Sequence, residues 1–131
     1  MPSANPFMSK YRQRADKNHV LVRNHLKAHG VEVIDILKPL DLLCNYQGDT
    51  FFVEVKADDK KEMYTRVQLQ FIATTRFDVI FAKTEAEALF AVKTRLYLTE
   101  SQKNAISGLL LRNSKDYFTS KDLRDILEEG I

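Results

Sequence analysis

A strand-like segment with two opposite charges carries the residues best suited to chemistry. Residues 50–57 read Thr-Phe-Phe-Val-Glu-Val-Lys-Ala, and such a run of β-branched and aromatic side chains predicts a β-strand. Side chains alternate along a strand, so Glu54 and Lys56 project from one face and the neighbouring valines from the other. We therefore expect a carboxylate and an ammonium group on the same side of an otherwise apolar strand.

A second carboxylate, Asp41, precedes this strand. Residues 47–49 lie between the two acids and read Gln-Gly-Asp, which is typical of a turn, so Asp41 and Glu54 can meet across a hairpin. Mg²⁺ prefers oxygen ligands and binds through one or two carboxylates while it keeps several waters. The sequence therefore predicts a Mg²⁺ site, with Mn²⁺ as a substitute, made by Asp41, Glu54 and the backbone carbonyl of Val55.

Such a site would suit hydrolysis of a phosphodiester bond. A divalent metal makes a water nucleophilic and offsets the charge of the leaving oxygen. Lys56 would orient or deprotonate the attacking water, or stabilise the charge of the transition state. A lysine beside a metal loses its proton more easily, which favours the role of base. We expect no organic cofactor.

Composition indicates the class of protein. The chain has 131 residues, of which 44% are hydrophobic and 29% charged, as expected for one soluble globular domain. No apolar run approaches the roughly 20 residues that span a bilayer, and the first residues lack the features of a signal peptide. The single cysteine, Cys44, excludes an internal disulfide, fits a reducing compartment and is expected to be buried. We expect a cytoplasmic protein of a bacterial, archaeal or phage-infected cell, without a membrane partner.

The charge of the chain is unevenly distributed. The formal net charge is +2, but residues 1–30 carry six Lys and Arg residues against one acid, Asp16. Lysine and arginine make most contacts with phosphate groups, so a polyanionic partner is expected for this segment. Charge alone also fits a solvated helix face. The candidate nucleic-acid contacts are Lys10, Arg12, Arg14, Lys17 and Arg23.

Three histidines share the predicted first helix. His25 and His29 are four residues apart and could hold a metal between them. No acid or cysteine close in sequence completes such a site, so we expect His19, His25 and His29 to be exposed or to face DNA.

Apolar periodicity and turn residues predict the order of the elements. Threonine-led capping boxes at Thr84, Thr99 and Thr119 predict three helices in the second half of the chain. The result is an α/β fold, a mixed sheet with helices packed on it. The preceding elements are a helix over 14–29, strands over 31–36, 40–46 and 50–57, a helix over 65–75 and a strand over 77–82.

The chain is expected to divide into three parts. Residues 1–11 form a loose arm, residues 12–98 form the core, and residues 99–131 form a helical tail. The tail could pack on the sheet, extend a dimer interface or form a small DNA-binding hairpin. Its apolar run at 109–111 favours packing or dimerisation.

These residues resemble the PD-(D/E)xK nuclease superfamily. Asp41 followed by Glu54-Val55-Lys56 on the next strand is similar to its signature. Gln68, near the start of the following helix, resembles a glutamine of the VRR-NUC and Holliday-junction-resolvase-like branches. The segment 14–18 is similar to the start of small phage and bacterial members, and the resemblance spans residues 12 to about 92.

The resemblance implies a restriction-endonuclease-like core with the order α-β-β-β-α-β and a Mg²⁺-dependent endonuclease. It implies action on branched DNA, such as Holliday junctions or flaps, in recombination or repair. Paired cuts would need a homodimer with two sites. Gln68 would contact the scissile phosphate or a metal-bound water.

Two positions depart from the family pattern. Pro39 stands two residues before Asp41 instead of next to it, and the middle of the first helix lacks the glutamate of many members. Asp16 is the nearest acid and would be the additional metal ligand. The alternatives to a nuclease are a non-catalytic nucleic-acid-binding module on the same fold and an interaction protein, such as a phage accessory protein acting through its tail.

Overall fold

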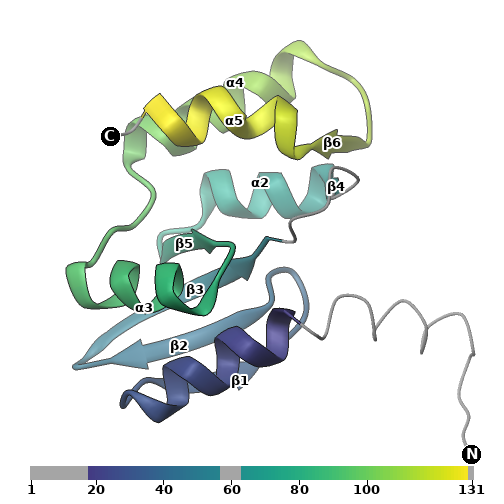
Figure 1. Ribbon diagram of the computed structural model, residues 1–131. Coiled ribbons are helices and arrows are strands. Elements are labelled where there is room, and N and C mark those ends of the chain that lie inside the picture. The colour runs from purple at the N-terminus through teal and green to yellow at the C-terminus, as the bar shows by residue number, and fades with distance from the viewer. Residues whose placement is uncertain (1–17, 57–62, 130–131) are drawn as a thin grey trace, which may run out of the picture.

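A mixed four-stranded sheet lies at the centre of the computed structural model, which describes residues 18–56 and 63–129 (Figure 1). The strand order is β1-β2-β3-β5; β2 runs antiparallel to both β1 and β3, and β5 is parallel to β3. The predicted α/β class is therefore confirmed. The strands are β1 (Glu32–Asp35), β2 (Leu42–Tyr46), β3 (Asp49–Val55) and β5 (Asp78–Ala82).

The hairpin between β2 and β3 sets the register of the sheet. Tyr46 pairs with Asp49, so two residues form the turn, and both have positive φ: 51° at Gln47 and 88° at Gly48. This backbone matches the right-handed twist of the flanking strands, and glycine adopts it without strain. The predicted turn is confirmed, and its register places the start of β2 beside the end of β3.

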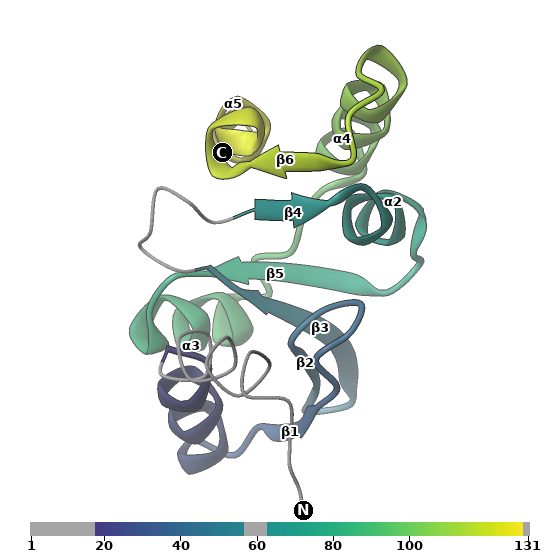
Figure 2. The ribbon, with the colours of Figure 1, turned by 90° about the vertical axis from the view of Figure 1, so that its right-hand side faces the viewer.

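One face of the sheet is covered by the N-terminal helix, described over residues 18–28, and by α3 (Glu85–Thr94) (Figure 2). Gly30, with φ of 87°, ends the N-terminal helix as expected from the sequence. Side chains from both helices and alternate residues of the strands form a continuous buried cluster on this face. Its members include Val22, Leu26, Leu42, Cys44, Val53, Ile80, Ala88 and Val92.

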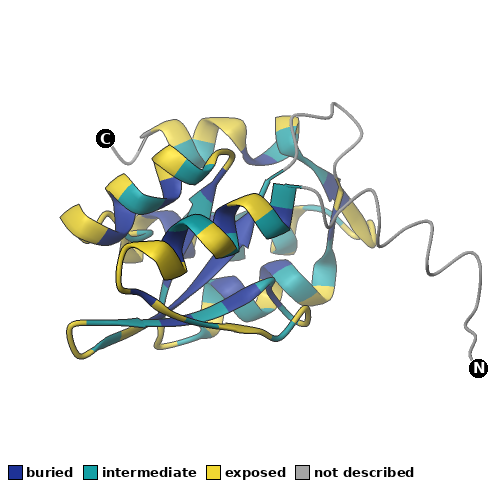
Figure 3. Ribbon diagram, turned by 60° about the horizontal axis from the view of Figure 1, so that its bottom comes forward, coloured by how far each residue is buried: buried dark blue, intermediate teal, exposed yellow. Residues whose placement is uncertain are grey.

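The opposite face is covered by α2 (Arg66–Thr74), with α4 (Glu100–Arg112) packed against α2 and α5 (Ser120–Glu129) beyond them (Figure 2). The buried residues lie on the strands of the sheet and on the helix faces turned toward it (Figure 3). The described part of the tail, residues 99–129, therefore contributes to a core shared with the sheet, although Leu111 is exposed. This second cluster includes Leu40, Phe52, Leu69, Ile72, Val79, Ile106, Phe118 and Leu123.

A small second sheet ties the C-terminal segment to the rest of the chain. Its antiparallel strands are β4 (Met63–Thr65) and β6 (Tyr117–Thr119), and Tyr64 and Phe118 are both buried beneath it. The sequence did not predict either strand, because three residues are too short for a recognisable alternation.

All three threonine-led helix starts are present, two of them with both bonds of the capping box. Thr99 and Gln102 make a complete capping box, and Thr119 and Asp122 exchange the same pair of bonds. Thr84 accepts a bond from the backbone of Glu87, but the Glu87 carboxylate bonds to another residue's N–H. Among the residues that the structure describes, no helix is long and apolar enough to cross a membrane.

Candidate functional site

The structure brings the two predicted carboxylates together where β2 begins and β3 ends. Glu54 Oε1 accepts a hydrogen bond from the backbone N–H of Asp41 at 3.1 Å. Asp41 Oδ2 in turn accepts one from the backbone N–H of Val55 at 2.8 Å. Each acid is thus held by the backbone of the other strand, a direct consequence of the hairpin register.

The backbone of Asp41 is also fixed by the connection that precedes it. Its carbonyl accepts hydrogen bonds from the N–H groups of Ile36 and Leu37, both at 3.1 Å. The preceding residue, Leu40, is fully buried in the second cluster. The position of Asp41 is therefore determined by packing as well as by its side chain.

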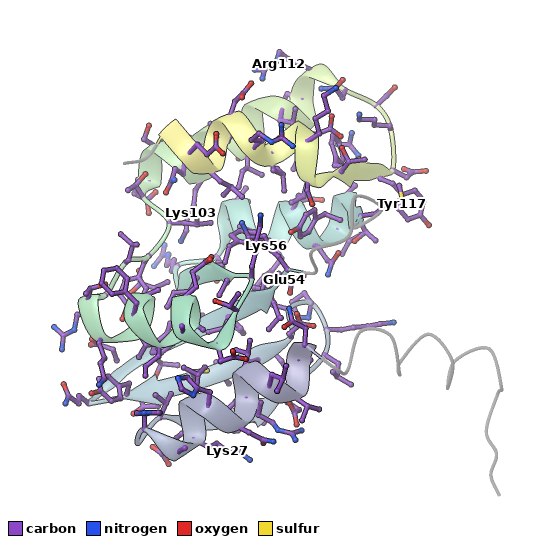
Figure 4. All side chains as sticks on the ribbon, in the orientation of Figure 1. Lys27, Glu54, Lys56, Lys103, Arg112 and Tyr117 are labelled. Carbon is purple, nitrogen blue, oxygen red and sulfur yellow. The ribbon has the colours of Figure 1, made fainter. Side chains whose placement is uncertain are left out.

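Lys56 lies on the same side of β3 as Glu54 (Figure 4). Its Nζ is 5.4 Å from the ring centre of Phe81, the residue that pairs with Glu54 on β5. Glu54 is only 6% exposed, whereas Lys56 is half-buried. An ammonium group over an aromatic face is attracted to it, which helps to hold Lys56 on the side of the acid.

The Val55 carbonyl points toward the side of Asp41. The N–H of Lys56 donates to the Ala82 carbonyl on β5 at 2.7 Å. Across a trans peptide, a carbonyl and the following N–H point in opposite directions. The Val55 carbonyl is therefore directed away from β5, as its predicted role as a ligand requires.

These donors fit one kind of metal ion better than others. Over residues 18–56 and 63–129, no group of three or more His, Cys, Asp and Glu side chains could hold a metal. Two carboxylates and a backbone carbonyl suit Mg²⁺, which keeps several waters, and do not suit a metal that needs three or four side-chain ligands. Asp16, the predicted additional ligand, lies outside the described residues.

Gln68 is bonded within the protein at both ends of its amide. It is the third residue of α2, where its Oε1 accepts from the N–H of Thr65 at 3.0 Å in a complete capping box. Its Nε2 donates to the carbonyl of Pro39 at 3.1 Å. Gln68 thus ties the start of α2 to the chain just before Asp41. The Thr-x-x-Gln spacing signals this capping role in the sequence.

His19 is a residue of the site that the sequence interpretation missed. It is 4% exposed, its Nε2 lies 2.6 Å from Asp35 Oδ1, and its Nδ1 lies 3.8 Å from Asp41 Oδ1. The Asp41 carboxylate, followed by that of Asp35, raises the pKa of His19 above its usual range, although burial opposes the shift.

The expectation that His19 is exposed or faces DNA is therefore wrong. The spacing of His19, Val22 and Leu26 on one helix face, at i, i+3 and i+7, was the available signal, because the two apolar residues face the sheet. His29 is exposed, as expected, whereas His25 is half-buried.

Arg23 extends the network from His19 to the surface. Its Nη1 lies 3.0 Å from Asp35 Oδ2, so the predicted nucleic-acid contact is engaged by a carboxylate. Partial burial raises the pKa of Asp35, but hydrogen bonds from His19 and Arg23 outweigh it and leave the pKa below its usual value. The other candidate contacts, Lys10, Arg12, Arg14 and Lys17, lie outside the described residues.

Asn18 joins the N-terminal helix to the ends of the two parallel strands. Its Nδ2 donates to the carbonyls of Lys56 at 2.9 Å and Lys83 at 2.7 Å. Ligand sites in α/β sheets commonly lie at the carboxyl ends of parallel strands. Asn18 thus holds the backbone of Lys83 beside that of Lys56. Lys83 is an exposed cation that the sequence interpretation did not single out.

Comparison of the chain with protein-family models, with curated proteins and with solved structures found no match.

Proposed function

We propose that this protein is a metal-dependent endonuclease that hydrolyses DNA phosphodiester bonds. The observation that carries the proposal is the arrangement at the end of β3. Asp41 and Glu54 are locked together through backbone hydrogen bonds, and Lys56 lies on the side of Glu54. An acid pair with an adjacent cation matches the needs of phosphodiester hydrolysis.

The arrangement of elements supports a restriction-endonuclease-like core. The N-terminal helix, β1, β2, β3, α2 and β5 follow one another in the order α-β-β-β-α-β, and among the described residues the short β4 stands between β3 and α2. The acid pair lies at the open end of the β2–β3 hairpin, next to the carboxyl ends of the parallel strands β3 and β5.

In this proposal the side chains have separate roles. Asp41, Glu54 and the Val55 carbonyl would hold Mg²⁺ or Mn²⁺. The bound ion would supply Lewis-acid stabilisation of the phosphate and a more acidic water. Lys56 would orient the attacking water or donate to the charge that develops on the phosphate. Gln68 would act by fixing the chain before Asp41, since its amide is already bonded there.

The proposal extends to the substrate and the assembly. Branched DNA, such as a four-way junction or a flap, is the substrate class that the resemblance of the motif suggests. Paired cuts at a junction require two sites, which a homodimer provides. The basic residues of the N-terminal segment and Lys83 would contribute phosphate contacts.

Cleavage assays test the proposal. Labelled four-way junction, flap, duplex and single-stranded DNA are incubated with the protein in Mg²⁺, Mn²⁺ or EDTA. Glu54→Gln keeps an oxygen that can accept the Asp41 N–H bond but removes the charge, so cleavage should fall at least ~100-fold while the fold is retained. Cleavage by Lys56→Gln should fall by a similar factor. Cleavage by Lys121→Gln, which changes an exposed residue of α5, should match that of the wild type.

The other outcomes have distinct meanings. Undiminished cleavage by Glu54→Gln would contradict the proposal. DNA binding that weakens with salt, without cleavage in either metal, would indicate a non-catalytic nucleic-acid-binding module. Absence of DNA affinity at low salt would indicate an interaction protein.

A further inference from the structure

A buried histidine connects the acid pair to the edge strand of the sheet. His19 comes from the N-terminal helix, Asp35 ends β1 and Asp41 immediately precedes β2. The three side chains form a row in which the imidazole lies between two carboxylates, 2.6 Å from Asp35 Oδ1 and 3.8 Å from Asp41 Oδ1.

The orientation of the His19 ring is fixed from one end. A carboxylate only accepts hydrogen bonds, so the 2.6 Å contact places the proton on Nε2 between His19 and Asp35. Asp35 is held in turn by Arg23, whose Nη1 is 3.0 Å from its other oxygen. With Nε2 anchored in this way and the ring 4% exposed, Nδ1 is directed at Asp41.

Each oxygen of Asp41 therefore has its own neighbour. Oδ2 accepts the Val55 N–H at 2.8 Å, and Oδ1 faces His19 Nδ1 at 3.8 Å. Two neighbours on different elements define the plane of a carboxylate, whereas one bond leaves it free to rotate. Val55 belongs to the β2–β3 hairpin, whereas His19 belongs to the N-terminal helix.

We propose that His19 is a positioning residue, which holds the Asp41 carboxylate in the orientation that binds a divalent cation. The inference rests on the proposed function in so far as Asp41 is a metal ligand. Residues that contact a metal ligand from behind orient it and tune its affinity, and their loss commonly costs about 10- to 100-fold in metal binding. At 3.8 Å, His19 Nδ1 lies beyond hydrogen-bond distance of Asp41 Oδ1 and restrains it as a close neighbour. Asp35 acts one step further away, by anchoring the ring.

Two substitutions separate this role from simple filling of the core. Asparagine places its amide nitrogen where His19 has Nδ1, and glutamine reaches the position of Nε2. His19→Asn can therefore keep a nitrogen beside Asp41 and loses the bond to Asp35. His19→Gln can keep the bond to Asp35 and loses the group that faces Asp41. A histidine that only fills space predicts the same metal affinity for both variants.

The experiment measures Mn²⁺ affinity of the full chain by isothermal titration calorimetry, a readout that does not depend on cleavage. His19→Gln should weaken Mn²⁺ binding about 10-fold or more, and His19→Asn should weaken it less. His29→Gln, at an exposed position of the same helix, is the control for metal held by the His25–His29 pair and should match the wild type. Circular dichroism confirms that each variant is folded.

Wild-type affinity in folded His19→Gln would overturn the inference. If that variant does not fold, Asp35→Ala provides the test, because it changes a partly exposed residue and removes the carboxylate that anchors the His19 ring. Asp35→Ala should weaken Mn²⁺ binding, and unchanged affinity would overturn the inference.

The two proposals fail in different ways. Mn²⁺ binding that depends on Asp41 and His19 without any DNA cleavage would leave the positioning role standing and remove the nuclease. Cleavage that persists with normal Mn²⁺ affinity in His19→Gln would do the reverse. A wild-type protein that binds no Mn²⁺ would overturn both.

Discussion

The hydrogen bonds of Asp41 both stabilise the fold and position the residues of the proposed site. Its N–H donates to Glu54, and its carboxylate accepts from Val55. Hydrogen bonds to charged groups are stronger than those between neutral groups, so the acids stabilise the hairpin end. The same bonds, with His19 beside the other oxygen of Asp41, restrain both carboxylates before any ligand binds, which is the condition for a preorganised site.

Gln68 offers a direct test of structural against catalytic use. Gln68→Ala removes both the capping bond to Thr65 and the bond to the Pro39 carbonyl. Loss of a cap costs about 0.5–2 kcal/mol. The free energy of unfolding in urea should therefore fall by about that amount, whereas a residue reserved for the phosphate would leave it unchanged. Gln70→Ala is the matched control, because Gln70 lies two residues further along α2 and is exposed.

Cys44 should be inert in the folded protein. It is 2% exposed on β2, and burial raises its pKa to about 12. The reactive thiolate is therefore scarce at neutral pH. A thiol reagent such as Ellman's reagent should not react in native buffer and should react with one thiol per chain in urea. Rapid reaction without urea would show that the core around β2 opens.

The sequence predicted the relative positions of those site residues that local structure places. Glu54 and Lys56 share a face because they are two apart on one strand, and Asp41 meets Glu54 because a two-residue turn sets the register. The burial of His19 depends on where the N-terminal helix meets the sheet. No local pattern fixes the distance from its Nδ1 to Asp41.

At the scale of elements, helix starts were more predictable than short strands. Thr99 and Thr119 begin their helices with reciprocal bonds as expected, because these bonds form between residues three apart. The strands β4 and β6 form only because the segments 63–65 and 117–119 meet in space. Their pairing depends on contacts far apart in the chain, which a sequence window does not contain.

The start of α5 should depend on pH. The backbone bond from Thr119, together with Lys115 at 3.1 Å, lowers the pKa of Asp122. A group with a lowered pKa in the folded state contributes stability above its unfolded value, roughly 4, and loses it as the pH falls through its folded value.

Asp122→Asn isolates this contribution, because asparagine can still accept the Thr119 bond but carries no charge. The wild type should be more stable than Asp122→Asn by about 0.5–1 kcal/mol near neutral pH. The difference in free energy of unfolding should shrink toward zero as the pH is lowered below about 4. A difference that stays constant with pH would show that the charge of Asp122 contributes nothing.

For the whole molecule, the C-terminal helices and the sheet share one buried cluster. Ile106, Phe118 and Leu123 lie with Phe52 of β3 and Ile72 of α2 in that cluster. Hydrophobic patterning showed that the tail helices have apolar faces but not which surface they cover. That choice is made by long-range packing.

Arg66 adds polar bonds to this packing. It donates to the carbonyls of Leu110 at 3.1 Å, Lys115 at 3.0 Å and Asn113, so one side chain at the start of α2 holds the connection from α4 to β6. The bonds to Leu110 and Asn113 are partly buried, and a carbonyl that leaves water needs such a donor. The tail is thereby bound to α2 by apolar and polar contacts together.

If the tail is part of one cooperative unit, Phe118→Ala should destabilise the whole protein. Phe118 is fully buried, and removal of a buried aromatic ring costs about 3–5 kcal/mol. Its neighbour on β6, Tyr117, is 57% exposed, so Tyr117→Ala should cost less than about 1 kcal/mol. Urea unfolding followed by circular dichroism and by tyrosine fluorescence should show one transition that moves to lower urea only in Phe118→Ala. A second, early transition in that variant, with the main one unmoved, would instead mean that α4, β6 and α5 unfold separately from the sheet that carries Asp41 and Glu54.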